Sequence, residues 1–173
     1  GPLEQSFAPM SVALKPECEI DLSRGDMLGS PHTPPHVSNR FQAMVGWMNA
    51  QPLESGRNYL IKQTTREVRG RITRIRHRIN INTLEPEAVE RLEINDIAAV
   101  ELETSTPLFF DFYRQNRTTG SFIVIDPLTN STLGAGMIRE DLPEDVDMPP
   151  AAEQQRPRAL VNPLERHRRH GHY

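Results

Sequence analysis

The sequence predicts a small all-β domain, a barrel or a sandwich, on three observations. Between residues 40 and 140, roughly seven short segments of strand length follow one another. Turn-forming residues separate them at regular intervals, as at Thr106-Pro107 and Asp126-Pro127. Only one short stretch has the apolar spacing of a helix. The 173 residues suffice for one domain with appendages or for two very small ones.

The residues before position 40 are expected to form two strand segments and a linker. Residues 11–14 and 20–28 have strand-like apolar content, and Gly25 predicts a turn within the second segment. Residues 29–36 hold three Pro and one Gly, which excludes a helix or an interior strand. We therefore expect a Pro-rich linker at residues 31–38.

Three strands are expected in the first half of the main domain, at residues 41–48, 58–63 and 68–81. In the third, the apolar residues occupy even positions at Val68 and Ile72 and odd positions from Ile75 onward. A strand presents its side chains to alternate faces with a period of two residues. The switch near Thr73 therefore predicts a β-bulge or a sharp bend.

One stretch between the strands has a helical pattern. Thr83 can cap a helix and Pro86 suits its first turn. Apolar residues recur there at a spacing of four, at Leu84, Ala88 and Leu92. We expect one short helix of about two to three turns. Four more strands are expected after it, at residues 97–102, 108–113, 120–125 and 132–138.

The composition changes after residue 140. Residues 141–155 carry five acids and three Pro without any Lys or Arg. Residues 156–173 carry five Arg and three His with one acid. Because no apolar periodicity is present, residues 141–173 are expected to form a disordered linker, first acidic and then basic.

The motifs of nucleotide, hydrolytic and metal chemistry are missing. The sequence has no phosphate-binding loop, no dinucleotide-binding glycine pattern and no nucleophile elbow. The histidines lack the spacing of a zinc site, and Cys18 has no fixed base beside it. We therefore expect no catalytic, cofactor-binding or metal-binding residues, and no enzymatic activity of this chain alone.

Composition also bounds the compartment and the partners. A single cysteine, no signal-peptide pattern and no apolar run of about 20 residues predict a cytoplasmic protein without a membrane partner. The net charge of −3 excludes a globally basic nucleic-acid-binding protein, so a nucleic-acid partner is not the first expectation.

Six arginines between positions 66 and 78 form the main charge feature. Strand alternation puts Arg74, Arg76 and Arg78 on one face and His77, as a packed core residue, on the other. One interpretation is a basic strip that binds RNA, phosphate or an acidic protein surface. The other is a solvated face neutralised by acids on neighbouring strands. Arg74, Arg76, His77 and Arg78 are our candidate partner-binding residues.

Several motifs resemble known proteins. Residues 134–138, which follow Asn130-Ser131-Thr132, resemble the closing strand of the third domain of elongation factor Tu, and residues 122–126 fit the strand before it. Other stretches are similar to the GTPase large subunit of bacterial sulfate adenylyltransferase (ATP sulfurylase). They are residues 19–26, 47–48, 51–53, 59–62, 75–83, 95–97 and 126–130.

The resemblance implies an architecture and a function. Residues 39–140 would form a closed antiparallel barrel of the elongation factor Tu third-domain type, and residues 1–30 a remnant of a preceding β-barrel domain. GTP and Mg would belong to an N-terminal domain missing from this sequence. The expected function is that of a non-catalytic barrel in sulfate activation, which docks the GTPase domain and the catalytic subunit. An adenylylsulfate kinase domain is a further expected partner, because the tail resembles the approach to the kinase of fused relatives.

Two other interpretations stay open. A translation-factor-like barrel would bind RNA, since the corresponding domain of elongation factor Tu touches tRNA. It predicts salt-dependent RNA binding that is lost when Arg74, Arg76 and Arg78 become Ala. An inert, truncated gene remnant would fold normally and bind no partner.

Overall fold

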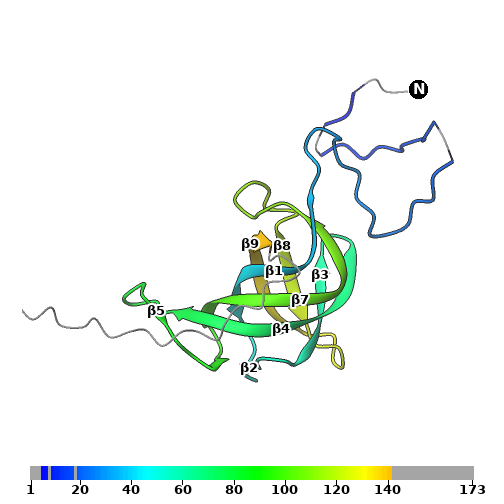
Figure 1. Ribbon diagram of the computed structural model, residues 1–173. Helices are drawn as coiled ribbons and strands as arrows, with labels where there is room; N and C mark the ends of the chain where they lie inside the picture. The colour runs from blue at the N-terminus through cyan, green and yellow to red at the C-terminus, as the bar shows by residue number, and fades with distance from the viewer. Residues whose placement is uncertain (1–4, 8, 18, 142–173) are drawn as a thin grey trace, which may run out of the picture. The chain divides into compact units, whose positions relative to one another are not determined.

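The structure, a computed structural model, describes residues 5–7, 9–17 and 19–141 (Figure 1). The long strands are β1 His36–Trp47, β3 Asn58–Gln63, β4 Arg66–Ile79, β7 Ile97–Phe110, β8 Ser121–Ile125 and β9 Thr132–Asp141. These six strands close into an antiparallel barrel in the order β3-β8-β9-β1-β7-β4, because β4 also pairs with β3. Figure 1 shows β1, β7 and β4 side by side. The closed barrel confirms the expected all-β fold class.

Three two-residue strands complete the described secondary structure. The strands β2 Leu53–Glu54 and β6 Arg91–Leu92 pair with each other, and β5 Pro86–Glu87 pairs with the end of β4. No helix of the described residues has the length and apolar content needed to cross a membrane.

Alternating side chains fill the barrel. The inward side chains of β1 are Phe41, Ala43, Val45 and Trp47, and all four are buried. The ring of Phe41 lies 5.3 Å from that of Phe110 on β7 and 6.0 Å from that of Phe122 on β8. This period of two, repeated on each strand, leaves the other set of side chains on the outside of the barrel.

The expected bulge is present in β4, and a second one follows it. The register against β7 shifts between Ile72 and Arg74, which confirms the irregularity predicted near Thr73. It shifts again between Ile75 and His77. The apolar pattern shows only the first shift, because few apolar residues follow Ile75.

The second shift changes which arginines share a face. Arg78 is opposite Ala98, which is buried, so Arg78 lies on the inward side at that end of the strand. Arg74 lies on the outward side. The expectation that Arg74, Arg76 and Arg78 share one face is therefore wrong, because an extra residue in a strand reverses the alternation beyond it.

The expected helix does not form. The side-chain oxygen of Asn80 accepts hydrogen bonds from the backbone N–H groups of Asn82 and Thr83, at 2.9 and 3.3 Å, and so holds a turn. Leu84 follows with φ of 60°, outside the range of a right-handed helix. Leu84 is 75% exposed whereas Leu92 is fully buried, so the residues at a spacing of four share no face.

The strands expected on either side of Thr106-Pro107 form a single strand, β7. The register against β1 shifts between Ser38 and Arg40, and residues 104–107 have no partner on β1. Pro107 is tolerated at this irregularity, since no regular ladder there needs its missing N–H group.

The described residues before β1 contain turns and no strand, so the strands expected at residues 11–14 and 20–28 are absent. The turn within the second segment is present. Asp26 N–H donates to Ser23 O at 3.1 Å, and Gly25 has φ of 102°. The assignment of this part to a preceding barrel stays a prediction.

The borders of the barrel can be compared with the expected linkers. β1 begins at His36, within the expected linker at residues 31–38. β9 ends at Asp141. The disordered linker expected at residues 141–173 lies outside the described residues from position 142 onward.

Candidate functional site

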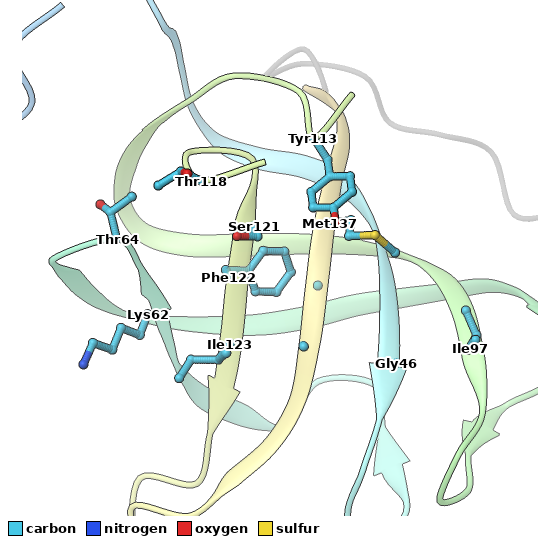
Figure 2. Close-up of a pocket in the computed structure, with 12 residues that line it drawn as sticks. Gly46, Lys62, Thr64, Ile97, Tyr113, Thr118, Ser121, Phe122, Ile123 and Met137 are labelled. Atoms are coloured by element: carbon cyan, nitrogen blue, oxygen red, sulfur yellow. The ribbon is translucent and has the colours of Figure 1, made fainter. Parts of the chain in front are cut away.

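An apolar groove of about 650 Å³ crosses the outside of the barrel over β8, β9 and β1 (Figure 2). The pairing register places outward residues of these strands and of β7 in two rows that run across the strands. The second row lies two residues further along each strand than the first. We call seven outward residues of these rows the outer strip: Ile123, Ala135, Gly46 and Ile97 in the first row, and Met137, Met44 and Ala99 in the second, of which Met44 and Ala99 lie beside the groove.

Small residues between larger ones make the groove. Gly46 and Ala135 are directly opposite each other, and a Cβ atom on Gly46 would have no neighbour within 4 Å. Ile97 on one side is 40% exposed, and Met137 is 36% exposed. The groove is therefore an apolar hollow, open to the outside, between aliphatic side chains that the barrel core does not use.

Polar groups border this groove. Figure 2 shows Tyr113 next to Met137 at one end, and Lys62 and Thr64 from the β3 side at another. The guanidinium of Arg117 lies over the ring of Tyr113, 6.0 Å from its centroid. Tyr113 thus combines an apolar ring that lines the groove with a cationic neighbour.

Two smaller hollows adjoin the outer strip and add cations to it. One, of about 360 Å³, is lined by Tyr113, Arg114, Met137 and Arg139 among others. The other, of about 330 Å³, is lined by Gln42, Ala43, Arg76, His77, Ala99 and Arg139. We call Arg76, His77, Arg114 and Arg139 the basic border.

The structure separates the four predicted partner-binding residues. Arg76 and His77 line the third hollow, next to the outer strip. His77 lies on the outside, opposite Ala99, and not in the core as expected. Arg74 is opposite Glu101 and lines none of the three hollows around the strip.

Arg78 has a structural role at the β4–β5 hairpin. Its Nη2 donates to Glu87 Oε2 at 2.6 Å, and its Nη1 lies 3.4 Å from Asp96 Oδ1. The hydrogen bond to Glu87, followed by the charge of Asp96, raises the pKa of the Arg78 guanidinium. The hydrogen bond from Asn80, followed by that from Arg78, lowers the pKa of Glu87.

Acids on β7 pair with two further arginines of β4. Arg71 Nη2 donates to Glu103 Oε2 at 2.7 Å, and Arg76 Nε lies 3.8 Å from Glu101 Oε1. These pairs favour the interpretation of the arginine run as a face neutralised by neighbouring acids. Arg76 differs from Arg71 because it also lines the hollow of about 330 Å³ beside the outer strip.

Sequence reasoning missed Arg114 and Arg139. The outward parity of Met44 and Met137 on their strands is a signal that the sequence contains. The register that puts the two methionines opposite each other cannot be predicted from either segment alone. Among the described residues, no group of three His, Cys, Asp or Glu side chains is placed to hold a metal ion.

The fold and the sequence are similar to those of known proteins. The family model described as GTP-eEF1A C-terminal domain-like matches residues 40–139. A crystal structure of Sup35 complexed with GDP superposes with a TM-score of 0.60 at 20% identity, over 66% of this chain and 28% of that one. At this identity the likeness shows the fold alone.

Two relatives are closer in sequence. Sulfate adenylyltransferase subunit 1 of Bacteroides fragilis (strain YCH46) is 46% identical over 138 residues, which are 80% of this chain and 29% of that protein. The bifunctional enzyme CysN/CysC of Mycobacterium tuberculosis (strain ATCC 25618 / H37Rv) is 40% identical over 168 residues, which are 96% of this chain and 27% of that protein. The chain therefore spans less than a third of the length of these relatives.

The match with sulfate adenylyltransferase subunit 1 covers most of the chain and confirms the resemblance that the separate motifs indicate. The family model covers nearly the whole barrel, from the fifth residue of β1 to Arg139 on β9. The chain belongs to the GTP-eEF1A C-terminal domain-like family.

Proposed function

We propose that this barrel is a non-catalytic docking module of a sulfate adenylyltransferase large subunit. It serves sulfate activation by binding the GTPase domain of that subunit and the catalytic subunit of the enzyme. The observation that carries the proposal is the outer strip, an exposed apolar surface with a groove on a barrel whose own core is already filled.

A closed barrel suits this role physically. Its strands have no free edges for strand addition, so partners bind to the outward side chains of a rigid wall. Contiguous apolar side chains on such a wall lose contact with water when a protein covers them, and this burial favours association. Tyr113 and the two methionines are residue types enriched at protein interfaces.

The relatives give the proposal its biochemical context. Two names, sulfate adenylyltransferase subunit 1 and a bifunctional enzyme, describe proteins more than three times as long as the matched part. GTP and Mg binding would lie in the remainder of such a protein. A kinase domain fused beyond the barrel is a further proposed partner, in line with the bifunctional relative.

The ion pairs of β4 speak against RNA as the ligand. Arg71 and Arg78 each have an acidic neighbour within 4.0 Å. RNA phosphates would have to displace or share these carboxylates, which weakens the counterion-release term that drives nucleic-acid binding. We therefore place the protein-docking function ahead of the RNA-binding one.

The test is a calorimetric titration of this chain into the purified catalytic subunit of a bacterial sulfate adenylyltransferase, with co-elution on a sizing column as a second readout. We expect saturable one-to-one binding at moderate salt. The same titration with tRNA measures the competing function. Neither heat nor co-elution with the catalytic subunit at about 100 µM, a range that covers weak complexes, would contradict the proposal for this partner.

A further inference from the structure

We infer that the outer strip and the basic border form one composite site for an extended protein segment that combines an apolar anchor with acidic side chains. The inference rests on the proposed function, since it states which surface docks and what the partner presents to it. The occupant is thus a protein segment of defined chemistry, and an RNA or a second copy of the barrel is an alternative outcome of the test.

The apolar half of the site is the groove. Ala135 and Gly46 form its lowest part, and Ile123 and Ile97 stand on its two sides in the same row. Neighbouring strands lie about 4.8 Å apart, so this row spans roughly 14 Å. That width admits one or two aliphatic or aromatic side chains laid across the strands.

The cationic half of the site lies beside the second row. Among the described side chains, no carboxylate lies within 4.0 Å of Arg114 or Arg139, and both arginines are exposed. An exposed guanidinium offers five donors in a planar fork that matches a carboxylate. A partner acid would therefore find hydrogen-bond donors here that no described acid engages.

Glu101 attracts Arg76 but accepts no hydrogen bond from its guanidinium N–H groups. The side chain of Glu101 is 9% exposed, and its Oε1 atom lies 3.8 Å from Arg76 Nε without accepting a hydrogen bond. This distance gives an electrostatic attraction but no hydrogen bond. Arg76 is thus drawn toward the barrel wall while its guanidinium keeps its capacity for a second carboxylate.

The charge balance of this corner favours an acidic partner. Among the described side chains, Glu101 is the acid opposite Gln42 at this end of the barrel. The guanidiniums of Arg76, Arg114 and Arg139 line the hollows beside it. The excess is positive and lies next to exposed apolar surface.

The spacing between the two halves predicts a pattern in the partner. Arg139 is two residues beyond Met137 on β9, and His77 is opposite Ala99, two residues beyond Ile97 on β7. Two to four strand residues correspond to roughly 7–13 Å. An extended partner segment would therefore carry an apolar residue and an Asp or Glu two to four positions away from it.

Nucleic acid fits this site less well. Among the described residues that line the groove, Tyr113 has the only aromatic ring outside the core, and it is half-buried, since Phe122 belongs to the core. Single-stranded nucleic acids need several aromatic platforms along a basic groove. The glycine and alanine at its lowest part and the isoleucines on its two sides offer neither an aromatic stacking surface nor a side-chain hydrogen bond.

The first experiment measures the affinity of the catalytic subunit for two site variants and two matched controls. Gly46→Arg fills the open groove, and Arg139→Glu reverses a charge of the basic border. Their controls are Ser105→Arg and Arg69→Glu, at exposed positions on β7 and β4 that line a different hollow. Unchanged thermal unfolding shows that each variant is folded.

We expect both site variants to weaken binding by about tenfold or more, and both controls to change it by less than about threefold. The affinity of Arg139→Glu should also depend less steeply on salt. If the original chain binds and the site variants bind equally well, the composite site is wrong although the docking function stands.

A second experiment tests the site when the catalytic subunit does not bind at all. The chain is used to select from a random peptide library, in parallel with Gly46→Arg. We expect the original chain alone to enrich peptides with an apolar residue and an acid two to four positions apart. No enrichment, a basic motif, or equal enrichment by both chains would overturn the inference. Retention of tRNA, lost in Gly46→Arg, would assign the site to RNA.

Discussion

The ring of Phe122 occupies the space where a side chain on Gly136 would lie. The two residues are directly opposite each other on β8 and β9, and a Cβ atom on Gly136 would overlap the ring atoms of Phe122. Phe122 packs edge-on against Phe41 on the other side, so it has little room to retreat. The glycine at position 136 therefore sets how closely β9 covers the core.

Gly136→Ala should destabilise the barrel. Overpacking a filled core costs about 1–3 kcal/mol of unfolding free energy. The measurement is denaturant unfolding of the variant and of the original chain. Gly46→Ala is the matched control on the neighbouring strand, where a Cβ atom meets nothing within 4 Å. Equal stabilities of the two variants would show that β9 can move away from Phe122.

Gln63→Leu should destabilise the barrel through lost hydrogen bonds. The side chain is 1% exposed, and its Nε2 donates to Phe109 O at 2.8 Å and to Thr119 O at 2.7 Å. Leucine fills a similar volume but leaves both carbonyls without this donor. The expected cost is about 1–3 kcal/mol of unfolding free energy.

Gln63→Glu distinguishes hydrogen bonding from packing at this position. It keeps the shape of glutamine but replaces the donor with an acceptor that is charged at neutral pH. Because burial favours the neutral form, this variant should recover stability when the pH is lowered. A pH-independent loss in both variants would point to packing.

Thr64→Asn should stabilise the β3–β4 hairpin. Thr64 and Thr65 form its two-residue loop, and Thr64 has φ of 51°. A β-branched residue is strained in this region, which asparagine adopts more readily. The expected gain is up to about 1 kcal/mol, seen as a higher Tm. Thr65→Asn is the control, since its φ is not positive, and it should bring no such gain.

Glu87→Gln should change how stability depends on pH. The pKa of Glu87 is lowered in the folded barrel by hydrogen bonds from Asn80 and then Arg78. A lowered pKa contributes stability above the ordinary pKa of a glutamate, and this contribution is lost as the pH falls through the folded value. The original chain should thus be the more stable at pH 7, with the difference shrinking toward pH 3.

The measurement is thermal unfolding between pH 7 and pH 3, a window that spans about four units around the ordinary glutamate value. Glu85→Gln on the same connection is the control, because Glu85 has no side-chain hydrogen bond among the described residues. A constant difference between Glu87→Gln and the original chain across this window would contradict the linkage.

Much of the fold was predictable because its signals are local. The strand at residues 58–63 has the bounds that the sequence predicts, and the bulge near Thr73 follows from a change of parity within one segment. The false helix shows the limit of such signals. The spacing of four from Leu84 to Leu92 is genuine, but the Asn80 turn and the pairing of Leu92 with Leu53 outweigh it.

The candidate site was predictable only in part. The arginine run pointed to Arg76 and His77, which do lie beside the outer strip. It also pointed to Arg78, whose role at the β4–β5 hairpin depends on acids from other segments. Arg114 and Arg139 were not predicted, since neither belongs to a dense run of basic residues like that of β4.

The sequence by itself determined most of the strand segments of the barrel, the place of one bulge and most of the apolar side chains that fill the core. These properties depend on residues two to four positions apart, so the alternation of apolar and polar residues along one segment predicts them. Only the tertiary structure decided that six strands close on themselves and that Gly46, Ala135, Ile97 and Ile123 meet in one row. Such meetings depend on register between segments up to about ninety residues apart, and a one-residue slip would turn every one of those side chains to the other face.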